Sequence, residues 1–347
     1  MTTGFKSGSS NAENCYGEWQ LHVETALKKE NVGMPDALVF EGGGILGIAY
    51  PSALRVASEQ NALQNVCKYA GASAGSLVAG MLACGANIDF LEQKLDTIDY
   101  AALFDSTFGF VRDACRFYKR GGYARGAALR SHIEKCLWDL TGDASITFAD
   151  VERRFGNELK VVTTSMTERR SLVFDALTTP DYPVANALVA SSSFPLAYPM
   201  IDYCDKQTGR AHKLWDGGLL NNFPIQLFDE QRTTSLEQPH ERWPNERGTL
   251  GFKLLLPHEK IPGQSSATAQ HRVDNVFGAV RGLLACWSDA SARVHLNDTL
   301  DWPRTLPIRI PIPLSVMDFA LADAEKQTLK RAGRESALAF FESLKKR

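Results

Sequence analysis

The sequence is most constrained by a Gly-x-Ser-x-Gly pattern, in which Gly71 and Gly75 stand two residues on either side of Ser73. Residues 68–72 predict a short strand, and the small residues at 74–80 predict a helix. A strand that turns directly into a helix brings backbone segments close together, and glycines at these two positions remove the Cβ atoms that would collide. The Ser73 hydroxyl is then exposed in a strained turn at a helix N-terminus, whose free N–H groups can hold an anion. Ser73 is therefore the candidate nucleophile, with a chance pattern in a chain of 27 glycines as the alternative.

A second glycine-rich turn follows the apolar strand predicted for residues 36–41. Its sequence, Gly-Gly-Gly-Ile-Leu-Gly at 42–47, is also a literal Gly-x-Gly-x-x-Gly, the pattern of dinucleotide-binding loops. That function requires an acidic residue at the end of the next strand. This strand ends in Gly-Ala-Ser instead, and the nearest acid, Glu59, lies on the intervening helix. A nucleotide-binding module that uses this loop therefore remains the weaker alternative.

The stronger interpretation of the same loop is an oxyanion hole. Three successive glycines let backbone N–H groups point at one spot without obstruction by side chains. Loops that follow neighbouring parallel strands open at the same edge of a sheet, so this loop and the serine turn are expected to face each other. A turn that merely lets a helix pack is the structural alternative. The expected donors are the amides of Gly42, Gly43, Gly44, Gly47 and Ala74.

A carboxylate is the candidate partner of Ser73. A predicted hairpin delivers Asp216 at the end of a strand, and Gly217 and Gly218 follow at once. An acid at this point is placed to face across the sheet edge, although an aspartate in an ordinary turn before two glycines gives the same pattern. Serine needs such a partner because a free hydroxyl is a poor nucleophile.

Histidine is the usual proton acceptor for serine, but none of the seven histidines adjoins a glycine turn. His212 lies four residues before Asp216, and four strand residues span about 13 Å, so these two side chains can hardly both touch Ser73. The spacing favours direct contact between Ser73 and Asp216, with the basicity of the carboxylate raised by burial. A Ser-His-Asp carboxylesterase that uses His212 or a more distant histidine such as His295 remains the alternative.

Three motifs occur in a fixed order, at residues 42–47, 71–75 and 216–218, and the segment 190–199 (ASSSFPLAYP) precedes the last of them. In this order they resemble the patatin-like phospholipase family of lipid acyl hydrolases, over about residues 36–225. The resemblance implies an α/β fold, a three-layer sandwich with a mostly parallel central sheet flanked by helices and related to doubly wound folds.

The resemblance also implies a hydrolase of lipid metabolism, of phospholipase A type, that cleaves carboxylic esters. Ser73 and Asp216 would form its catalytic dyad, the glycine loop its oxyanion hole, and the chemistry would need no cofactor and no metal. One position departs from the family pattern, because Leu46 stands where Arg or Lys often precedes the last glycine of the loop. A basic residue there could help to hold anionic head groups, so its absence leaves the head-group preference open.

Size and composition fit this class. The chain has 347 residues, 44% hydrophobic and 22% charged, which is enough for one large α/β domain or two small ones. The formal net charge of -2 gives no case for nucleic acid as a partner.

The N-terminus lacks the apolar core of a signal peptide, and no apolar run approaches the ~20 residues that span a bilayer. The seven cysteines are dispersed, without a C-x-x-C pair or a histidine cluster, so neither zinc nor a disulfide framework is indicated.

These features predict a cytoplasmic protein, with peripheral membrane binding or export without a cleaved signal as the alternatives. We expect a polar N-terminal arm over residues 1–34 and a single hydrolase domain over 35–347. Its motif core is 36–225, and a C-terminal extension of strands and helices follows over 226–347. The expected partner is a lipid substrate at a membrane or micelle surface, with no nucleic acid and no transmembrane segment. The sequence does not assign an oligomeric state.

An aromatic stretch at 103–111 is followed by the basic residues Arg112, Arg116, Lys119, Arg120 and Arg125. An apolar patch beside a basic rim would suit an acyl chain and an anionic head group, although a core segment with a solvated face has the same pattern. Gly121 and Gly122 would then hinge a mobile cover.

The clearest helix, 323–346, has a narrow face made by Leu329, Gly333, Ser336, Ala337, Phe340 and Leu344. Other strands are predicted at 159–165, 171–175, 201–205, 211–215, 249–256 and 305–312, and other helices at 21–29, 48–60, 183–191 and 273–291.

Replacing the histidines distinguishes a Ser-Asp dyad from a Ser-His-Asp triad. If a histidine carries the proton, replacing His212 or His295 lowers turnover by more than ~1000-fold. Direct contact between Ser73 and Asp216 predicts that neither replacement does so. Ester turnover by His212→Ala and His295→Ala, measured beside the wild type, checks this, and a loss of that size in either variant contradicts the dyad.

Overall fold

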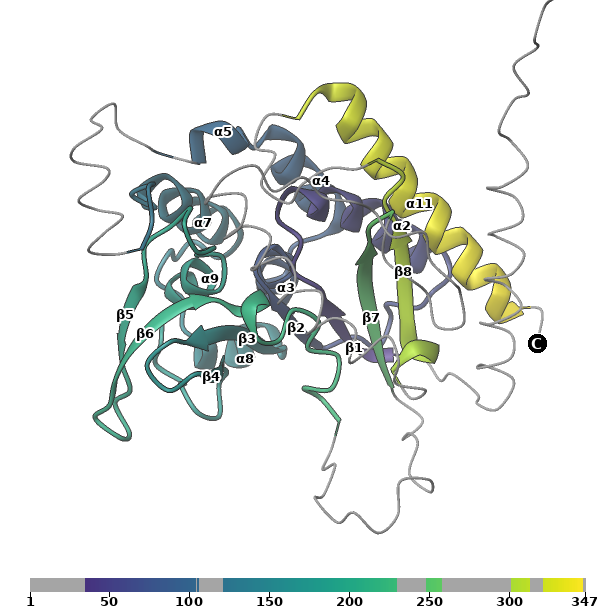
Figure 1. Cartoon of the computed structure of the whole chain (residues 1–347). Helices are drawn as coiled ribbons and strands as arrows, with labels where there is room; N and C mark the ends of the chain where they lie inside the picture. Colours follow the sequence, from purple (N-terminus) through teal and green to yellow (C-terminus); the bar gives the residue numbers. More distant parts are fainter. Residues whose placement is uncertain are drawn as a thin grey trace, which may run out of the picture.

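The computed structural model of the chain describes residues 35–103, 105, 121–229, 248–257, 301–312 and 321–345. Within these residues, eight strands form one sheet, seen at the centre of Figure 1. The strands are β1 (Pro35–Phe40), β2 (Lys68–Ala72), β3 (Glu158–Ser165), β4 (Arg170–Phe174), β5 (Ile201–Cys204), β6 (Ala211–Asp216), β7 (Gly248–Leu255) and β8 (Thr305–Arg309).

Helices flank this sheet in a three-layer α/β architecture (Figure 1), as the resemblance to the family implied. The strand order is β5-β6-β3-β2-β1-β7-β8, with β4 on the other edge of β3, and β3, β2, β1, β7 and β8 run parallel. The helices are η1 (Gly44–Ala49), α2 (Tyr50–Glu59), α3 (Ala74–Ala83), α4 (Ile88–Thr97), α5 (Tyr100–Leu103), α7 (Ala127–Thr141), α8 (Phe148–Phe155), α9 (Val184–Ser191), η2 (Gly217–Leu219), η3 (Trp302–Arg304) and α11 (Asp323–Lys345).

The core lies on both faces of the sheet because β1 is buried on both. Leu38 and Phe40 belong to the large core that packs against α2, α3, α9 and α11. Val39 points to the opposite face, where it packs with Ala70 against Phe223. A near-continuous apolar strand is typical of a parallel sheet that is covered on both sides.

Strand β3 has two different neighbours along one of its edges. Its first half pairs with β2 in parallel, up to the pair Ala72–Val162, and its second half pairs with β6 in antiparallel orientation from the pair Thr163–Asp216 onward. Both neighbours lie on the same edge, because β4 pairs with residues 161–165 from the other edge. The C-terminal ends of β2 and β6 therefore meet head to head beside consecutive residues of β3.

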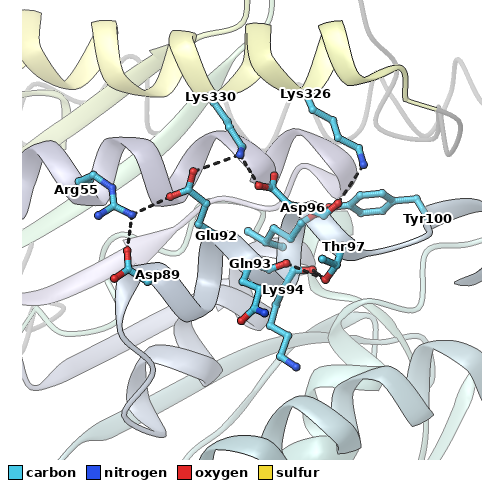
Figure 2. Close-up of polar contacts among 11 residues, drawn as sticks. Arg55, Asp89, Glu92, Gln93, Lys94, Asp96, Thr97, Tyr100, Lys326 and Lys330 are labelled. Carbon is cyan, nitrogen blue, oxygen red and sulfur yellow. Dashed lines mark hydrogen bonds and ion pairs between the residues drawn. The ribbon is translucent and has the colours of Figure 1, made fainter.

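Polar contacts fasten α4 to α2 and α11 (Figure 2). Arg55 of α2 pairs with Asp89 at 2.7 Å and with Glu92 at 2.8 Å. Lys330 of α11 pairs with Glu92 at 3.2 Å and also contacts Asp96. Because all of these groups are partly exposed, each pair contributes at most about 1 kcal/mol. They fix the position of α4 more than they stabilise the fold.

Most predicted elements are present within a residue or two of the expected ends. The helix expected at 48–60 is divided, because a 3₁₀ turn, η1, precedes α2. Thr147 caps α8, and its side chain accepts a hydrogen bond from the Asp150 N–H at 3.2 Å. Gly122 lies tightly against the 196–199 segment, where an added Cβ would be 2.1 Å from the Tyr198 carbonyl carbon.

Several predictions of the sequence fall outside the described residues. These are the arm at 1–34 with its short helix, most of the aromatic and basic stretch at 103–120, and the helix at 273–291. In the part of the chain that is described, no helix is both long and apolar enough to cross a membrane.

Replacement of Gly333 by alanine is expected to destabilise the protein. The new Cβ would lie 2.1 Å from the Ala49 carbonyl oxygen, so α11 must move away from η1. We expect a net loss of about 1–2 kcal/mol, since overpacking outweighs the gain in helix propensity. Urea unfolding measures this loss. Arg331→Ala, an exposed change on the same helix, is the control and should stay within about 0.5 kcal/mol of wild type. An unchanged Gly333→Ala would contradict the close packing.

Candidate active site

Ser73 lies between β2 and α3 in a backbone conformation that few residues adopt. Its φ of 50° and ψ of -129° fall outside the favoured regions for an L-residue, so the turn is strained. The turn requires glycine at the two flanking positions, because a side chain at either would collide with the backbone. A Cβ on Gly71 would lie 2.4 Å from the Gly75 carbonyl carbon, and one on Gly75 would lie 2.3 Å from the Phe40 carbonyl oxygen. The turn therefore holds the serine at the carboxyl edge of the sheet.

The carboxylate of Asp216 is in direct contact with this serine. The Ser73 hydroxyl donates to Asp216 Oδ2 at 2.7 Å, across 143 positions of sequence. The register explains the contact, since Ala72 and Asp216 lie beside consecutive residues of β3 and Ser73 is the next residue of its chain. The other carboxylate oxygen, Oδ1, accepts from the Gly218 N–H at 2.7 Å. Both oxygens of Asp216 are thus held in defined positions.

Burial changes the acidity of Asp216. The residue is 2% exposed, and desolvation raises the pKa of its carboxyl from 3.8 to about 7, against the lowering effects of the hydrogen bonds from Ser73 and Gly218. A carboxylate with this pKa is a much stronger base than an aspartate in water. It can accept and return a proton near neutral pH.

The glycine loop lies against the serine turn, as its position after the neighbouring strand predicted. A Cβ on Gly42 would lie 2.9 Å from Ser73 Cβ and 2.3 Å from Asn222 Oδ1. Asn222 holds this glycine in two ways: its carbonyl oxygen accepts from the Gly42 N–H at 3.0 Å, and its side-chain amide donates to the Gly42 carbonyl oxygen at 3.0 Å. The amide of Gly42 is thus already bound, while Gly43 and Gly44 line the pocket with Ser73.

The glycines of the loop are not equally required by space. Gly43 faces Leu254, whose Cδ1 would lie 2.3 Å from an added Cβ, and Gly44 has a φ of 53° that favours glycine. Gly47 also lines the pocket, but its nearest neighbour would be Ala74 Cβ at 3.6 Å, an ordinary contact. Steric need for glycine is therefore strongest at the start of the loop.

A buried ion pair holds the start of the glycine loop in place. Glu41 precedes the first glycine, and its carboxylate pairs with Lys253 of β7 and accepts from the Leu254 N–H at 2.8 Å. Tyr50 of α2 donates to the Glu41 carbonyl oxygen. Neither charged residue was predicted as part of the site, although a lysine within the apolar strand Gly-Phe-Lys-Leu-Leu was a visible signal.

A predominantly apolar pocket of about 190 Å³ opens beside the reactive residues. Side chains from α3, α4, α7 and the glycine loop line it, among them Leu46, Leu77, Val78, Leu95, Ile98 and Leu129. Leu46, where the family often has a basic residue, is buried in this lining. The pocket is suited to a hydrocarbon chain attached to a group that reaches Ser73.

Of the seven histidines, His132 and His212 lie among the residues that the structure describes. His212 is buried, with Nδ1 3.1 Å from Ser165 Oγ, and its ring packs beside Tyr203. His295 lies outside the described residues. His132 of α7 lines the pocket, and burial, followed by the charge of Lys94, lowers its pKa. His132 was not predicted as part of the site, because only the packing of α7 brings it to the pocket.

A Gly-x-Ser-x-Gly turn at the carboxyl edge of an α/β sheet is typical of hydrolases with a serine nucleophile. A model of the family described as patatin-like phospholipase matches residues 38–229, more than half of the chain. The sequence is also 31% identical over 314 residues to the uncharacterized protein YqhO of Bacillus subtilis, which covers 87% of this chain and 96% of YqhO. The chain belongs to the patatin-like phospholipase family.

Two further similarities agree with this assignment. The probable lipid hydrolase 463L of Invertebrate iridescent virus 6 is 26% identical over 196 residues, 55% of this chain and 62% of that protein. The crystal structure of VipD from Legionella pneumophila superposes with a TM-score of 0.56 and 15% identity, over 89% of this chain and 67% of VipD, which is a likeness of fold. Membership of the family supports a lipid hydrolase and gives no support to a nucleotide-binding module.

The raised pKa of Asp216 makes stability depend on pH. Because folding raises this pKa from 3.8 to about 7, the protonated carboxyl favours the folded state. Its contribution is complete below the unfolded pKa and is lost as the pH rises through the folded pKa. Asp216→Asn removes this dependence, so its free energy of unfolding relative to wild type should increase from about pH 4 to pH 8. Chemical unfolding of both proteins over this range measures the difference, and a difference that does not vary with pH would contradict the raised pKa.

Proposed function

We propose that the protein is a lipid acyl hydrolase of phospholipase A type, with Ser73 as nucleophile and Asp216 as the base of a two-residue dyad. The observation that carries the proposal is the 2.7 Å hydrogen bond from the Ser73 hydroxyl to a buried carboxylate whose pKa is about 7. The adjoining apolar pocket and membership of the family support a lipid ester as the substrate.

The first half-reaction acylates the serine. Asp216 accepts the hydroxyl proton while Ser73 Oγ bonds to the ester carbonyl carbon, and the carbonyl oxygen becomes an oxyanion. The bond from this carbon to the alcohol oxygen then breaks, and the proton on Asp216 passes to that oxygen. The alcohol or lysolipid leaves with this oxygen protonated, and the acyl group remains on Ser73.

The second half-reaction is hydrolysis. Asp216 accepts a proton from water as the water oxygen bonds to the acyl carbon, and the proton returns to Ser73 Oγ when its bond to that carbon breaks. The free fatty acid leaves and the dyad is restored. In both steps the oxyanion is stabilised by the amides of Gly43 and Gly44, with the Ala74 amide at the start of α3 as a further donor. The Gly42 amide is bound to Asn222 and acts by positioning the loop.

The acyl chain of the substrate occupies the apolar pocket, and the protein acts on lipids presented at a membrane or micelle surface. Leu46 contributes hydrocarbon to the pocket instead of the positive charge that a basic residue would add. Binding energy therefore comes from the chain more than from an anionic head group near the loop.

A fluorophosphonate probe should label the wild type and fail to label Ser73→Ala, because it reacts with an activated serine.

Asp216→Asn should fold and lose turnover by about 100-fold or more, because the base is removed. In the wild type, kcat/KM should rise with pH through about 7, since only the ionised carboxylate accepts the proton. Labelling by mass spectrometry and initial rates on a panel of lipids give these results.

Ser145→Ala, an exposed change in a turn, is the control for labelling and turnover. Probe labelling that persists in Ser73→Ala would contradict the assignment of the nucleophile. A fully active Asp216→Asn would contradict the dyad.

A further inference from the structure

The segment Ser191–Ser193, at the end of α9, connects the two reactive side chains through their backbones. The Ser73 N–H donates to Ser191 Oγ at 2.9 Å, and the Asp216 N–H donates to the Ser193 carbonyl oxygen at 3.1 Å. The middle residue, Ser192, lines the same pocket as Ser73 and Asp216. Ser192 therefore stands between the anchor of the serine and the anchor of the carboxylate.

The three hydroxyl groups of this segment have different partners. Ser191 Oγ donates to the Val162 carbonyl oxygen at 2.6 Å, and Ser193 Oγ donates to the Val189 carbonyl oxygen at 2.7 Å. Ser192 Oγ is buried and has no hydrogen-bond partner among the residues that the structure describes. Buried polar groups in proteins are nearly always hydrogen-bonded. Ser192 is thus the one serine of this segment that lines the pocket and has a hydroxyl with no partner among the described residues.

The chain neighbours of Ser192, which bind Ser73 and Asp216, indicate which atom of an ester lies nearest to it. The glycine loop approaches Ser73 from β1, with Gly42 close to Ser73 Cβ. Ser191 and Asp216 engage Ser73 from the side of β3. An ester whose carbonyl oxygen points into the glycine loop has its alcohol oxygen on the side of Asp216, which must return the proton to it.

We propose that the Ser192 hydroxyl donates a hydrogen bond to the alcohol oxygen of the ester as that oxygen leaves. The inference rests on the proposed function and adds a third side chain that touches the reacting atoms. The proton delivered to the leaving oxygen still comes from Asp216, and Ser192 keeps its own proton. The bond stabilises the negative charge that develops on the alcohol oxygen before protonation is complete.

A comparison of two esters of the same acid tests this role. The alkoxide of an ethyl ester is a poor leaving group and needs the hydrogen bond, whereas p-nitrophenolate stabilises its own charge. Ser192→Ala should lower kcat/KM for the ethyl ester about tenfold and leave kcat/KM for the p-nitrophenyl ester within about twofold. The ratio is informative because kcat/KM reports the steps up to alcohol release, and both esters give the same acyl-enzyme.

Two variants in the same turn serve as controls. Ser192→Thr keeps a hydroxyl and should restore most of the wild-type ratio between the esters. Ser193→Ala removes a hydroxyl that is bound to Val189 and keeps the carbonyl that holds Asp216, so it should retain the wild-type ratio. Fluorophosphonate labelling of Ser73 in every variant shows that the site is assembled.

The outcomes separate this inference from the proposed function. A labelled Ser192→Ala with an unchanged ratio means that the hydroxyl is only hydrated, and this overturns the inference alone. An equal loss on both esters means that Ser192 supports the turn without touching the leaving oxygen, and this also overturns it. A wild type that neither labels at Ser73 nor hydrolyses either ester contradicts the proposed function and the inference together.

Discussion

The hydrogen bond between Ser73 and Asp216 is the contact on which the rest of the site depends, and β3 makes it possible. Because β2 and β6 end head to head along one edge of β3, residues 143 positions apart come within 2.7 Å. The strained serine turn and the close-packed glycines follow from this meeting. A Cβ on Gly217 would lie 2.2 Å from the Val162 carbonyl oxygen, so even the residue after the acid is limited to glycine.

Burial gives this contact its chemical character, and buried polar groups around it hold the geometry. Desolvation raises the pKa of Asp216 to about 7, while the hydrogen bond from Gly218 keeps the carboxylate oriented. The pair of Glu41 and Lys253 lies beneath the glycine loop, where a buried ion pair contributes position more than stability. The proposed site therefore combines buried, hydrogen-bonded polar groups, which hold the reactive residues in place, with an apolar pocket for the acyl chain.

Local patterns predicted most of the fold and the principal candidates. The alternation from apolar strand to glycine turn to small-residue helix identified β1, β2 and α3, and the spacing on the last helix identified the buried face of α11. Ser191, Asn222, Lys253 and His132 were missed as members of the site. Ser191, Asn222 and Lys253 bind groups that lie 118, 180 and 212 positions away in the sequence, and His132 reaches the pocket only through the packing of α7.

The sequence by itself determined where the chain must turn sharply, because Gly71 and Gly75 lie too close to neighbouring backbone for any side chain and Gly44 has a positive φ. The order of its three motifs also indicated the α/β class, through the resemblance to the patatin-like family. Only the tertiary structure decided which groups meet at those turns. Strand register along β3 is a long-range property: a shift of one residue would turn Asp216 to the other face of the sheet, and no local pattern specifies that register.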